Sequence, residues 1–427
     1  MRRADMLISL RGLQHHPQNG ETSMSTSLLY HAFGIRGYQY QATKFHSGGM
    51  TIRVAQAREK LCCPACGSSK VRIVEWFERR WRTVPIGSRE TWIEMSVPKV
   101  ECQKCFSRRR VTVSFAEPHK QHTRAFERYV VELLRFMTPQ DVSRHLGISW
   151  DLANDIQKRR LKRKFGRPKL KHLKRLAVDE VYVGKRHKYL TLVLDLDSGA
   201  VVFVGEGRGS ATLRPFFRRL RQSRAKVRAV ASDMAGGFLK AVREFLPEAR
   251  LVLDRFHVVK LFNEKLTKLR RDLYREATDD LHKAVLKGTR WLLLKNPENL
   301  DDDRNEHQRL QDALSLNAPL ATAYYLKEDL RQFWEQATKP QAERWLTAWC
   351  RRAEQTGIKV LQQMTRTLQK HRTSLLAWYD DPISTGPLEG VNNKLKLLQR
   401  QAFGYRDLEL FKLRILSLHT THKTLVG

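Results

Sequence analysis

The stretch Leu176-Ala177-Val178-Asp179-Glu180-Val181-Tyr182-Val183 decides the fold of the larger part of this chain. Its aliphatic and aromatic side chains predict a β-strand, and Asp179 stands inside that strand. Further strand-like and helix-like runs follow it, separated by turn signals such as Asp197-Ser198-Gly199. The predicted strands cover residues 189–195, 200–206, 227–232 and 250–254, and the predicted helices cover residues 213–220 and 236–245.

The order of these elements indicates an α/β domain of the ribonuclease H-like class. Three strands in succession are followed by helix, strand, helix and strand, which is the order of that fold. We therefore expect residues 176–256 to form the first part of such a domain. Residues 257–380 differ, because apolar side chains recur there at helical spacing, as in Leu326, Leu330 and Trp334. We expect this segment to be entirely helical.

The charge of the chain indicates a polyanionic partner. Its 427 residues include 79 Lys and Arg against 44 Asp and Glu, a net charge of +35, and 41% hydrophobic residues argue against a disordered chain. Such a surplus repels itself unless polyanions offset it, so nucleic acid is the expected partner. The length argues against a ribosomal or histone-like protein. No apolar run approaches the roughly 18 residues of a membrane span, so we expect no membrane partner. Residues 1–28 read as an irregular N-terminal extension.

Two cysteine pairs predict a structural zinc site. Cys63-Pro-Ala-Cys66 and Cys102-Gln-Lys-Cys105 each place two thiolates on one turn, and together they supply four soft ligands for one Zn²⁺ ion. Strands predicted over residues 71–76, 81–86 and 92–97 lie between the pairs, so residues 29–118 read as an N-terminal segment with a zinc ribbon. The alternatives are four unrelated buried thiols or a redox pair. We expect Cys62 and Cys350 to be core thiols.

A helix-turn-helix is predicted over residues 119–165. Met137–Leu146 reads as a helix, Gly147 as the turn, and Ser149 as the cap of a second helix that would enter the major groove. A plain helical hairpin is the alternative. A basic tract between Lys158 and Arg175 contains no acid, and its last part, residues 166–175, reads as a linker. Such a tract either is a solvated face or contacts phosphates. The expected DNA contacts are Ser149, Trp150, Asn154, Lys158, Arg159, Arg160, Lys162, Arg163 and Lys164.

Two aspartates have the surroundings that divalent-metal phosphoryl chemistry requires. Asp179 lies within an apolar strand, where an unpaired carboxylate is costly, and Asp233 directly follows a short apolar strand. Carboxylate oxygens suit Mg²⁺, and two such ions about 4 Å apart activate water and stabilise a leaving 3′ oxygen. On pattern alone, each residue is also compatible with an ordinary strand-end or turn aspartate.

A third acid, Glu389, lies in the first turn of a helix that is predicted to begin near Pro387. Asn392, Asn393 and Lys396 share its face, beside an apolar seam of leucines and valine. This polar face suits a surface that binds metal and DNA. The alternative is that Glu389 only complements the helix dipole.

Taken together, these motifs resemble the bacterial insertion-sequence transposases of the ISL3 family. The resemblance includes the cysteine pairs and the helix-turn-helix, covers about Leu29 to Leu418, and departs from the family where Thr385 replaces the Asn that is common there. Its sequence blocks are Ala177-Val178-Asp179-Glu180, Ser232-Asp233-Met234, Asp254-Arg255-Phe256-His257, and Gly386-Pro387-Leu388-Glu389-Gly390-Val391-Asn392-Asn393 through Gly404-Tyr405-Arg406.

The resemblance implies a DDE catalytic triad that holds two Mg²⁺ ions, and the triad falls on Asp179, Asp233 and Glu389. It also implies that residues 257–380 are an all-α insertion and that residues 381–427 are closing helices of the catalytic domain. The 156 positions from Asp233 to Glu389 agree with an insertion.

The pair Asp254-x-x-His257 resembles a motif of related transposase groups with helical insertions. We expect Asp254 and His257 to lie near the catalytic site, as we do for Asn392, Asn393 and Lys396. The alternative for Asp254 is a structural hydrogen bond at a strand end.

The predicted function is therefore a DNA transposase. It would bind the terminal inverted repeats of its element, cleave DNA with Mg²⁺, and transfer the freed 3′-OH to target DNA. A homodimer on paired ends and a cytoplasmic, nucleoid-associated location in a bacterium are expected. One alternative is a non-enzymatic, sequence-specific DNA-binding regulator derived from a transposase. A nuclease or junction resolvase is another, although it leaves two DNA-reading modules and a helical segment without a role.

Overall fold

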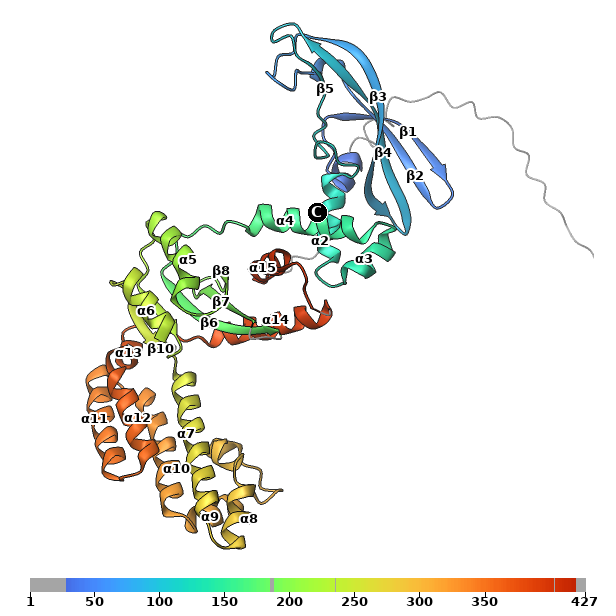
Figure 1. Ribbon diagram of the computed structural model, residues 1–427. Helices are drawn as coiled ribbons and strands as arrows, with labels where there is room; N and C mark the ends of the chain where they lie inside the picture. Colours follow the sequence, from blue (N-terminus) through green and yellow to red (C-terminus); the bar gives the residue numbers. More distant parts are fainter. Residues whose placement is uncertain (1–27, 185–187, 235, 403, 420–427) are drawn as a thin grey trace, which may run out of the picture. The chain divides into compact units, whose positions relative to one another are not determined.

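The computed structural model describes residues 28–184, 188–234, 236–402 and 404–419 (Figure 1). Almost all of the predicted N-terminal extension therefore lies outside the described residues. The chain divides into two compact units, residues 1–160 with 423–427, and residues 161–422.

The first unit contains a five-stranded sheet and three labelled helices. The strands are β1 (Tyr38–His46), β2 (Gly49–Gln56), β3 (Val71–Ile86), β4 (Arg89–Cys102) and β5 (Arg108–Arg110), in the order β1-β2-β4-β3 with β5 also paired to β4. Buried Trp81 and Phe115 meet edge to face in the core of the sheet, with ring centroids 5.1 Å apart. The predicted strands 71–76 and 81–86 are one continuous strand, so the prediction of two was wrong.

The predicted helix-turn-helix forms from α3 (Pro139–Leu146) and α4 (Trp150–Phe165), which follow α2 (Arg124–Leu133). Thr138 and Asp141 form a capping box at the start of α3, and Gly147 ends it at φ +62°, a backbone conformation that glycine adopts without strain. Helix α4 runs to Phe165, so the first part of the basic tract is helical.

The second unit is built on a mixed sheet with the order β10-β9-β6-β7-β8. The strands are β6 (Arg175–Gly184), β7 (Lys188–Asp195), β8 (Val201–Glu206), β9 (Ala229–Ser232) and β10 (Arg250–Leu253). β6, β7 and β8 form an antiparallel meander, whereas β9 pairs parallel to both β6 and β10. The carboxyl ends of β6, β9 and β10 therefore point the same way.

Helices cover both faces of this sheet. One face packs against α5 (Ser210–Gln222), α6 (Gly236–Phe245) and the start of α7 (Arg255–Glu276). The other packs against α14 (Gly386–Gln401) and α15 (Leu408–Leu416). Because side chains alternate along a strand, Val178 and Ala177 belong to opposite faces.

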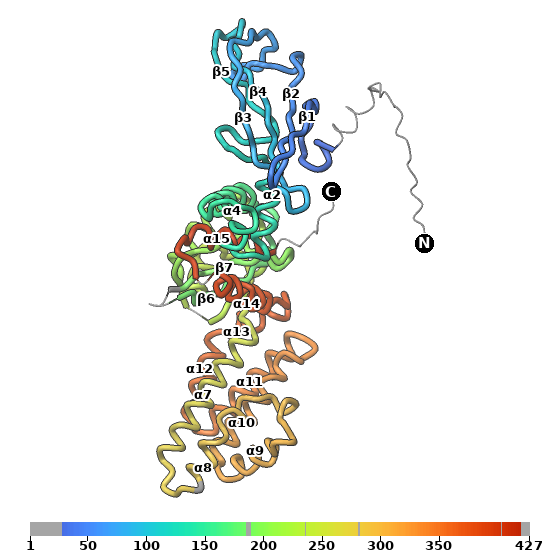
Figure 2. The backbone as a smooth tube through the Cα atoms, turned by 90° about the vertical axis from the view of Figure 1, so that its right-hand side faces the viewer, coloured from blue at the N-terminus to red at the C-terminus, as the bar shows by residue number. Residues whose placement is uncertain are grey.

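The chain between β10 and α14 contains helices and short 3-10 turns in the residues that the structure describes. They follow α7 in the order α8 (Asp280–Gly288), α9 (Glu306–Ser315), α10 (Ala318–Leu330), α11 (Lys339–Gln355), α12 (Lys359–Lys370) and α13 (Arg372–Leu376). Helix α7 contacts α10 and α12 along its length (Figure 2). Among the described residues, no helix combines the length and the apolar character needed to cross a membrane.

Candidate active site and zinc centre

The four predicted zinc ligands come together in the first unit. The sulfur atoms of Cys63, Cys66, Cys102 and Cys105 all lie within 4.8 Å of one another, and none is in a disulfide. The first pair lies on the turn before β3 and the second on the turn between β4 and β5, so the long β3–β4 hairpin brings the turns together. This convergence argues against four unrelated buried thiols.

Hydrogen bonds reach the sulfurs of this cluster and act in both directions. They lower the pKa of Cys63, whereas at Cys66 the bond with the backbone of Ser68, which lowers the pKa, is outweighed by desolvation and by bonds with the other sulfurs, led by that of Cys105, so its pKa is raised. The amides of Ala65 and Lys104 donate to the sulfurs of Cys63 and Cys102 at 3.4 and 3.3 Å. A hydrogen bond with Ser107 is the main cause that lowers the pKa of Cys63 to about 6. Four thiolate donors without an open position match a structural zinc site.

The two remaining cysteines lie outside this cluster. Cys350 is buried, as expected, whereas Cys62 is exposed, so the prediction of a core thiol there was wrong. Position 62 directly precedes the ligand turn that begins at Cys63.

The first two acidic residues lie side by side where the pairing of β6 with β9 ends: Asp179 is in the middle of β6, and Asp233 directly follows β9. Val178 on β6 pairs in parallel register with Ser232 on β9. Asp179 and Asp233 are the next residues along each strand, so the ladder sets them next to each other. The negative charge of Asp233 acts to raise the pKa of both Asp179 and Glu180.

Asp179 faces α14 and is largely buried. Its two carboxylate oxygens accept hydrogen bonds from the backbone amide of Glu180 at 2.8 Å and from Nδ2 of Asn392 at 3.1 Å. Burial is the main cause that raises the pKa of Asp179, and the charge of Asp233 adds to it. The nearby His257 acts in the opposite direction. A cation bound here would offset the cost of two neighbouring carboxylates.

Glu389 stands one turn before Asn392 on α14, and its side chain is exposed. The contact between Asn392 and Asp179 therefore places the helix that carries Glu389 against β6. The three acids do not converge as closely as the cysteines do. Within the described ranges, the cysteine cluster is the only group of three or more such ligands whose donor atoms lie within 4.8 Å.

Asp254 has a structural partner that the sequence did not reveal. Its side chain is buried and caps α7 by accepting from the amide of Phe256 at 2.9 Å. Its second oxygen accepts from the amide of Thr385 at 3.0 Å and from the hydroxyl of the same residue. The carboxylate thus joins the start of α7 to the residue before α14, and both of its oxygens are engaged.

His257 lies in the first turn of α7 and acts to lower the pKa of Asp179. Asn393 and Lys396 are exposed on α14. The site therefore contains His257 and Asn392 close to Asp179, whereas Asn393 and Lys396 have exposed side chains.

The predicted DNA-contact residues fall into two groups. Ser149 caps α4 through the amide of Leu152 at 3.1 Å, and Trp150 is 52% exposed. Asn154 donates to the carbonyl of Trp150 at 3.1 Å. These residues lie at the start of the second helix of the helix-turn-helix.

The cations of α4 make contacts within the protein. Arg159 forms an ion pair of 2.8 Å with buried Glu127, and Lys162 forms one of 2.9 Å with Glu409. Lys164 is exposed and lies over the ring of Phe165. The remaining three predicted cations also interact with other groups of the chain: Lys158, Arg160 and Arg163.

Sequence reasoning missed three charged residues near the acids. Glu180 lies within electrostatic reach of Asp233, and Arg208 and Lys260 lie within reach of Glu180. The signal for Arg208 was its place between two glycines, Gly207 and Gly209, which both have positive φ. Nothing in the sequence near Lys260 marks it.

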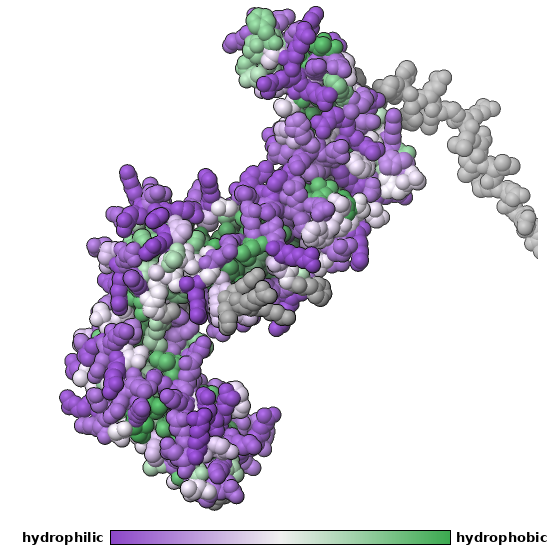
Figure 3. All heavy atoms as spheres, in the orientation of Figure 1, coloured by the Kyte–Doolittle hydropathy of each residue, from purple (hydrophilic) through white to green (hydrophobic). Residues whose placement is uncertain are grey.

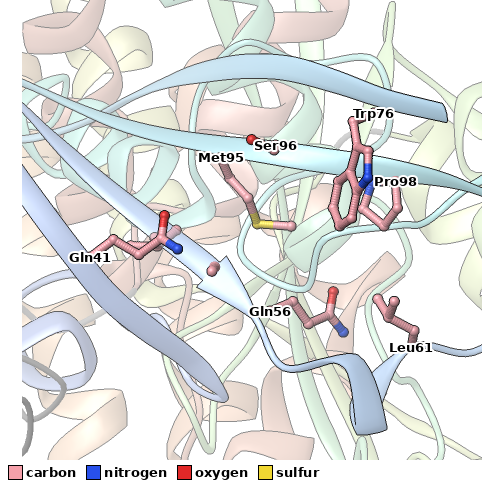
Figure 4. Close-up of a pocket in the computed structure, with 9 residues that line it drawn as sticks. Gln41, Gln56, Leu61, Trp76, Met95, Ser96 and Pro98 are labelled. Atoms are coloured by element: carbon pink, nitrogen blue, oxygen red, sulfur yellow. The ribbon is translucent and has the colours of Figure 1, made fainter. Parts of the chain in front are cut away.

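The pocket shown in Figure 4 is not a second catalytic site. It has a volume of about 250 Å³ and lies in the first unit, between Gln41, Gln56 and Trp76. Its lining contains no acidic, basic or thiol side chain. It therefore offers neither a metal site nor an acid–base pair.

Comparisons with known proteins identify three transposase domains in the same order along this chain. Family models match residues 59–105 as a zinc finger of transposases of the IS204, IS1001, IS1096 and IS1165 group, residues 111–161 as the helix-turn-helix domain of transposase family ISL3, and residues 176–415 as a transposase. The four-cysteine cluster is thus the metal centre of a zinc-binding domain, and a structural zinc ion is supported by both findings.

Two relatives are similar over most of their length. The chain is 30% identical to the transposase of insertion sequence element IS1001 from Bordetella parapertussis, over 86% of this chain and 90% of the relative. It is also 30% identical to the transposase of IS1557 from Mycobacterium tuberculosis, over 86% and 87%. Among solved structures, a chain of the Drosophila P element transposase strand transfer complex aligns with 70% of this chain and 91% of its own length, at 14% identity and a TM-score of 0.37. The chain belongs to the ISL3 family of insertion-sequence transposases.

Proposed function

We propose that this transposase binds the terminal inverted repeats of its insertion sequence, cleaves DNA with the help of Mg²⁺, and joins the freed 3′-OH to target DNA. The family membership supports DNA cleavage and transfer, and the net charge of +35 supports a DNA partner. Hydrophilic residues dominate the visible surface of each unit (Figure 3). Two ends must be processed together, which favours a homodimer on DNA.

The proposed fold of the catalytic part is ribonuclease H-like with an all-α insertion. The strand order across the sheet supports it. From one edge to the other the order is β8, β7, β6, β9 and β10, so two strands parallel to β6 continue the antiparallel meander. The helices from α7 to α13 lie between the last strand and the helix of Glu389, where an insertion would be placed. We place residues 176–256 and 381–427 in the catalytic domain and residues 257–380 in the insertion.

The proposed catalytic residues are Asp179, Asp233 and Glu389, a DDE triad. The first two fit a divalent cation because they are adjacent carboxylates, and burial and their mutual repulsion raise the pKa of Asp179. When bound, Mg²⁺ would polarise the phosphate and activate the attacking water. Asn392 and the amide of Glu180 orient Asp179 by hydrogen bonds. The exposed side chain of Glu389 has to turn toward them on binding.

Two DNA-reading modules are proposed for the first unit. The zinc ribbon and the helix-turn-helix match family domains, and Trp150 and Asn154 lie at the start of α4, which would enter the major groove. The exposed cations of the basic tract would contact phosphates.

The observation that carries the catalytic proposal is the adjacency of Asp179 and Asp233 directly beyond the last residue pair of the β6–β9 ladder. The test is nicking of a duplex that carries the inverted repeats, with and without Mg²⁺, by the full chain and by Asp179→Ala and Glu389→Gln. We expect both variants to lose cleavage and keep DNA binding, whereas Glu354→Gln on α11 cleaves normally. Cleavage without a divalent cation, or full cleavage by Asp179→Ala, would refute the proposal.

The same assay separates the second candidate, a non-enzymatic DNA-binding regulator. Such a protein would bind the repeats but would not nick them under any metal condition. All three acids are present, which favours the enzyme.

A further inference from the structure

Two tyrosines and an arginine form an exposed cluster in the second unit. Tyr182 on β6 is directly opposite Tyr189 on β7, and their rings meet edge to face with centroids 5.6 Å apart. The guanidinium carbon of Arg208 lies 5.0 Å from the ring centroid of Tyr189. Tyr182 is 52% exposed and Arg208 is exposed.

This cluster adjoins the acidic residues. Strand β9 ends at Ser232, so β6 beyond Val178 pairs with β7 alone. Tyr182 is two residues from Glu180 on the same face of β6, or about 7 Å; Asp179 is three residues away, or about 10 Å along the strand, and faces the other side, toward α14. That span is roughly three times the 3.4 Å rise per nucleotide of one B-DNA strand.

The loop that carries Arg208 is fixed to the same hairpin. The amide of Gly207 donates to the carbonyl of Tyr189 at 2.8 Å, and the hydroxyl of Thr191 donates to the carbonyl of Gly207 at 2.8 Å. Arg208 therefore keeps its place over Tyr189. Together with Lys260, it brings positive charge to Glu180 at the edge of the acidic site.

We propose that Tyr182, Tyr189 and Arg208 bind unpaired nucleotides next to the cleavage site. This proposal rests on the proposed catalytic function, because the strand would pass from Asp179 and Asp233 over the edge of β6 that β9 leaves open beyond Val178 and so reach the tyrosines on the other face. Aromatic rings that stack bases, combined with cations that hold the backbone, are the usual means of binding single-stranded DNA. The bases adjacent to the cleaved phosphate are the nucleotides within reach.

A second tyrosine pair shows what a purely structural pair looks like. Tyr324 and Tyr325 on α10 also meet edge to face, at 5.5 Å, and Lys327 lies over the ring of Tyr324. In that pair, Tyr324 and the nearby Lys327 are each only 4% exposed, so only the ring of Tyr325 is accessible to solvent. Because Tyr325 is 53% exposed, it is a matched control for Tyr182.

The test measures binding without cleavage, with Ca²⁺ in place of Mg²⁺. The probes are a duplex with the element's own terminal repeat and a short unpaired end that carries 2-aminopurine, and the same duplex fully paired. The full-length protein and Tyr182→Leu, Tyr182→Phe, Arg208→Gln and Tyr325→Leu are compared. Thermal unfolding checks that each variant is folded.

We expect Tyr182→Leu and Arg208→Gln to lower affinity for the unpaired end at least about fivefold, with little change for the paired duplex. Quenching of 2-aminopurine should fall in parallel, and Tyr182→Phe and Tyr325→Leu should behave as the wild type does. Unchanged preference for the unpaired end in both Tyr182→Leu and Arg208→Gln overturns the proposal. So does an equal loss in Tyr325→Leu. If the wild-type protein showed no Mg²⁺-dependent cleavage, only the proposed function would be refuted. The binding assay would still test the tyrosine cluster, because it needs no cleavage.

Discussion

At the scale of single residues, Asp179 is held in a state that costs the folded protein free energy in the absence of metal. Burial and the charge of Asp233 raise its pKa, so the folded chain binds a proton more tightly than the unfolded chain does. Stability therefore falls as pH rises from the ordinary aspartate pKa, about 3.9, through the raised one. A bound cation would remove this penalty.

We predict that Asp179→Asn abolishes cleavage yet makes the metal-free protein more stable at about pH 8. The amide removes the charge, and Asn392 can turn its own Oδ1, which has no partner in the described residues, toward the new donor. Urea unfolding in EDTA measures the effect. At an acidic pH, below the raised pKa of Asp179, the wild-type carboxyl takes up a proton and the difference should shrink. A variant less stable than the wild type at both pH values would contradict this account.

A second residue-scale prediction concerns Arg159, which the sequence placed among the DNA contacts. Its partner Glu127 is 1% exposed and also contacts His122 at 3.1 Å. Burial acts to raise the pKa of Glu127, but His122 and Arg159 outweigh it and lower that pKa overall. Arg159→Ala should destabilise the protein by about 3 kcal/mol, because a buried charge loses a partner.

Lys164→Ala is the matched comparison on the same helix. It is exposed, so its removal should change stability by less than about 0.5 kcal/mol and lower the salt dependence of DNA binding by about one counterion. Denaturant titrations and DNA binding at several salt concentrations measure both. If Arg159→Ala kept full stability and Lys164→Ala did not, the assignment of the two residues would have to be exchanged.

At the scale of elements, the bond from Asp254 to Thr385 links the place where the chain leaves the sheet to the place where it returns. Asp381, which is fully buried, adds ion pairs to Arg228 and Arg250 beside β9 and β10. The segment 381–385 is thus fixed to the sheet before α14 begins. The position of Glu389 depends on that attachment.

We predict that Thr385→Val destabilises the second unit by about 1–3 kcal/mol, because the buried carboxylate of Asp254 loses a donor. Cleavage should also need more Mg²⁺, since α14 is less well placed. Thr385→Ser keeps the hydroxyl and should restore both properties. The measurements are thermal unfolding and cleavage against Mg²⁺ concentration. A variant that lost stability with an unchanged Mg²⁺ requirement would show that this bond does not position Glu389.

The same elements show what the sequence could predict and what it could not. Strand and helix periodicity predicted each element of the α/β sheet and the helix-turn-helix, because those signals are local. The charged run Glu78-Arg79-Arg80 hid the continuity of β3, which its pairing with β4 maintains. Likewise, the partner of Asp254 lies 131 positions away, so no local pattern could identify it.

At the scale of the whole molecule, the zinc ligands could be predicted from the sequence more completely than the three acids. The cysteine spacing predicted a cluster that the structure forms, because two rigid turns fix four ligands. The adjacency of Asp179 and Asp233 follows from strand pairing, whereas Glu389 depends on the return of a long helical segment. Its assignment as the third catalytic acid stays a prediction.

The division into two units gives the final prediction, on metal removal. All four cysteines of the zinc cluster lie in the first unit. A zinc chelator should therefore lower the unfolding temperature of that unit and leave that of the second unit unchanged. Two calorimetric transitions are expected, because separate units need not unfold together. Cys66→Ser should lose zinc and reproduce the effect of the chelator. Cys62→Ser, one position before a ligand and exposed, should keep its zinc and both transitions. A chelator that shifted both transitions equally would mean that the metal stabilises the chain as a single cooperative body.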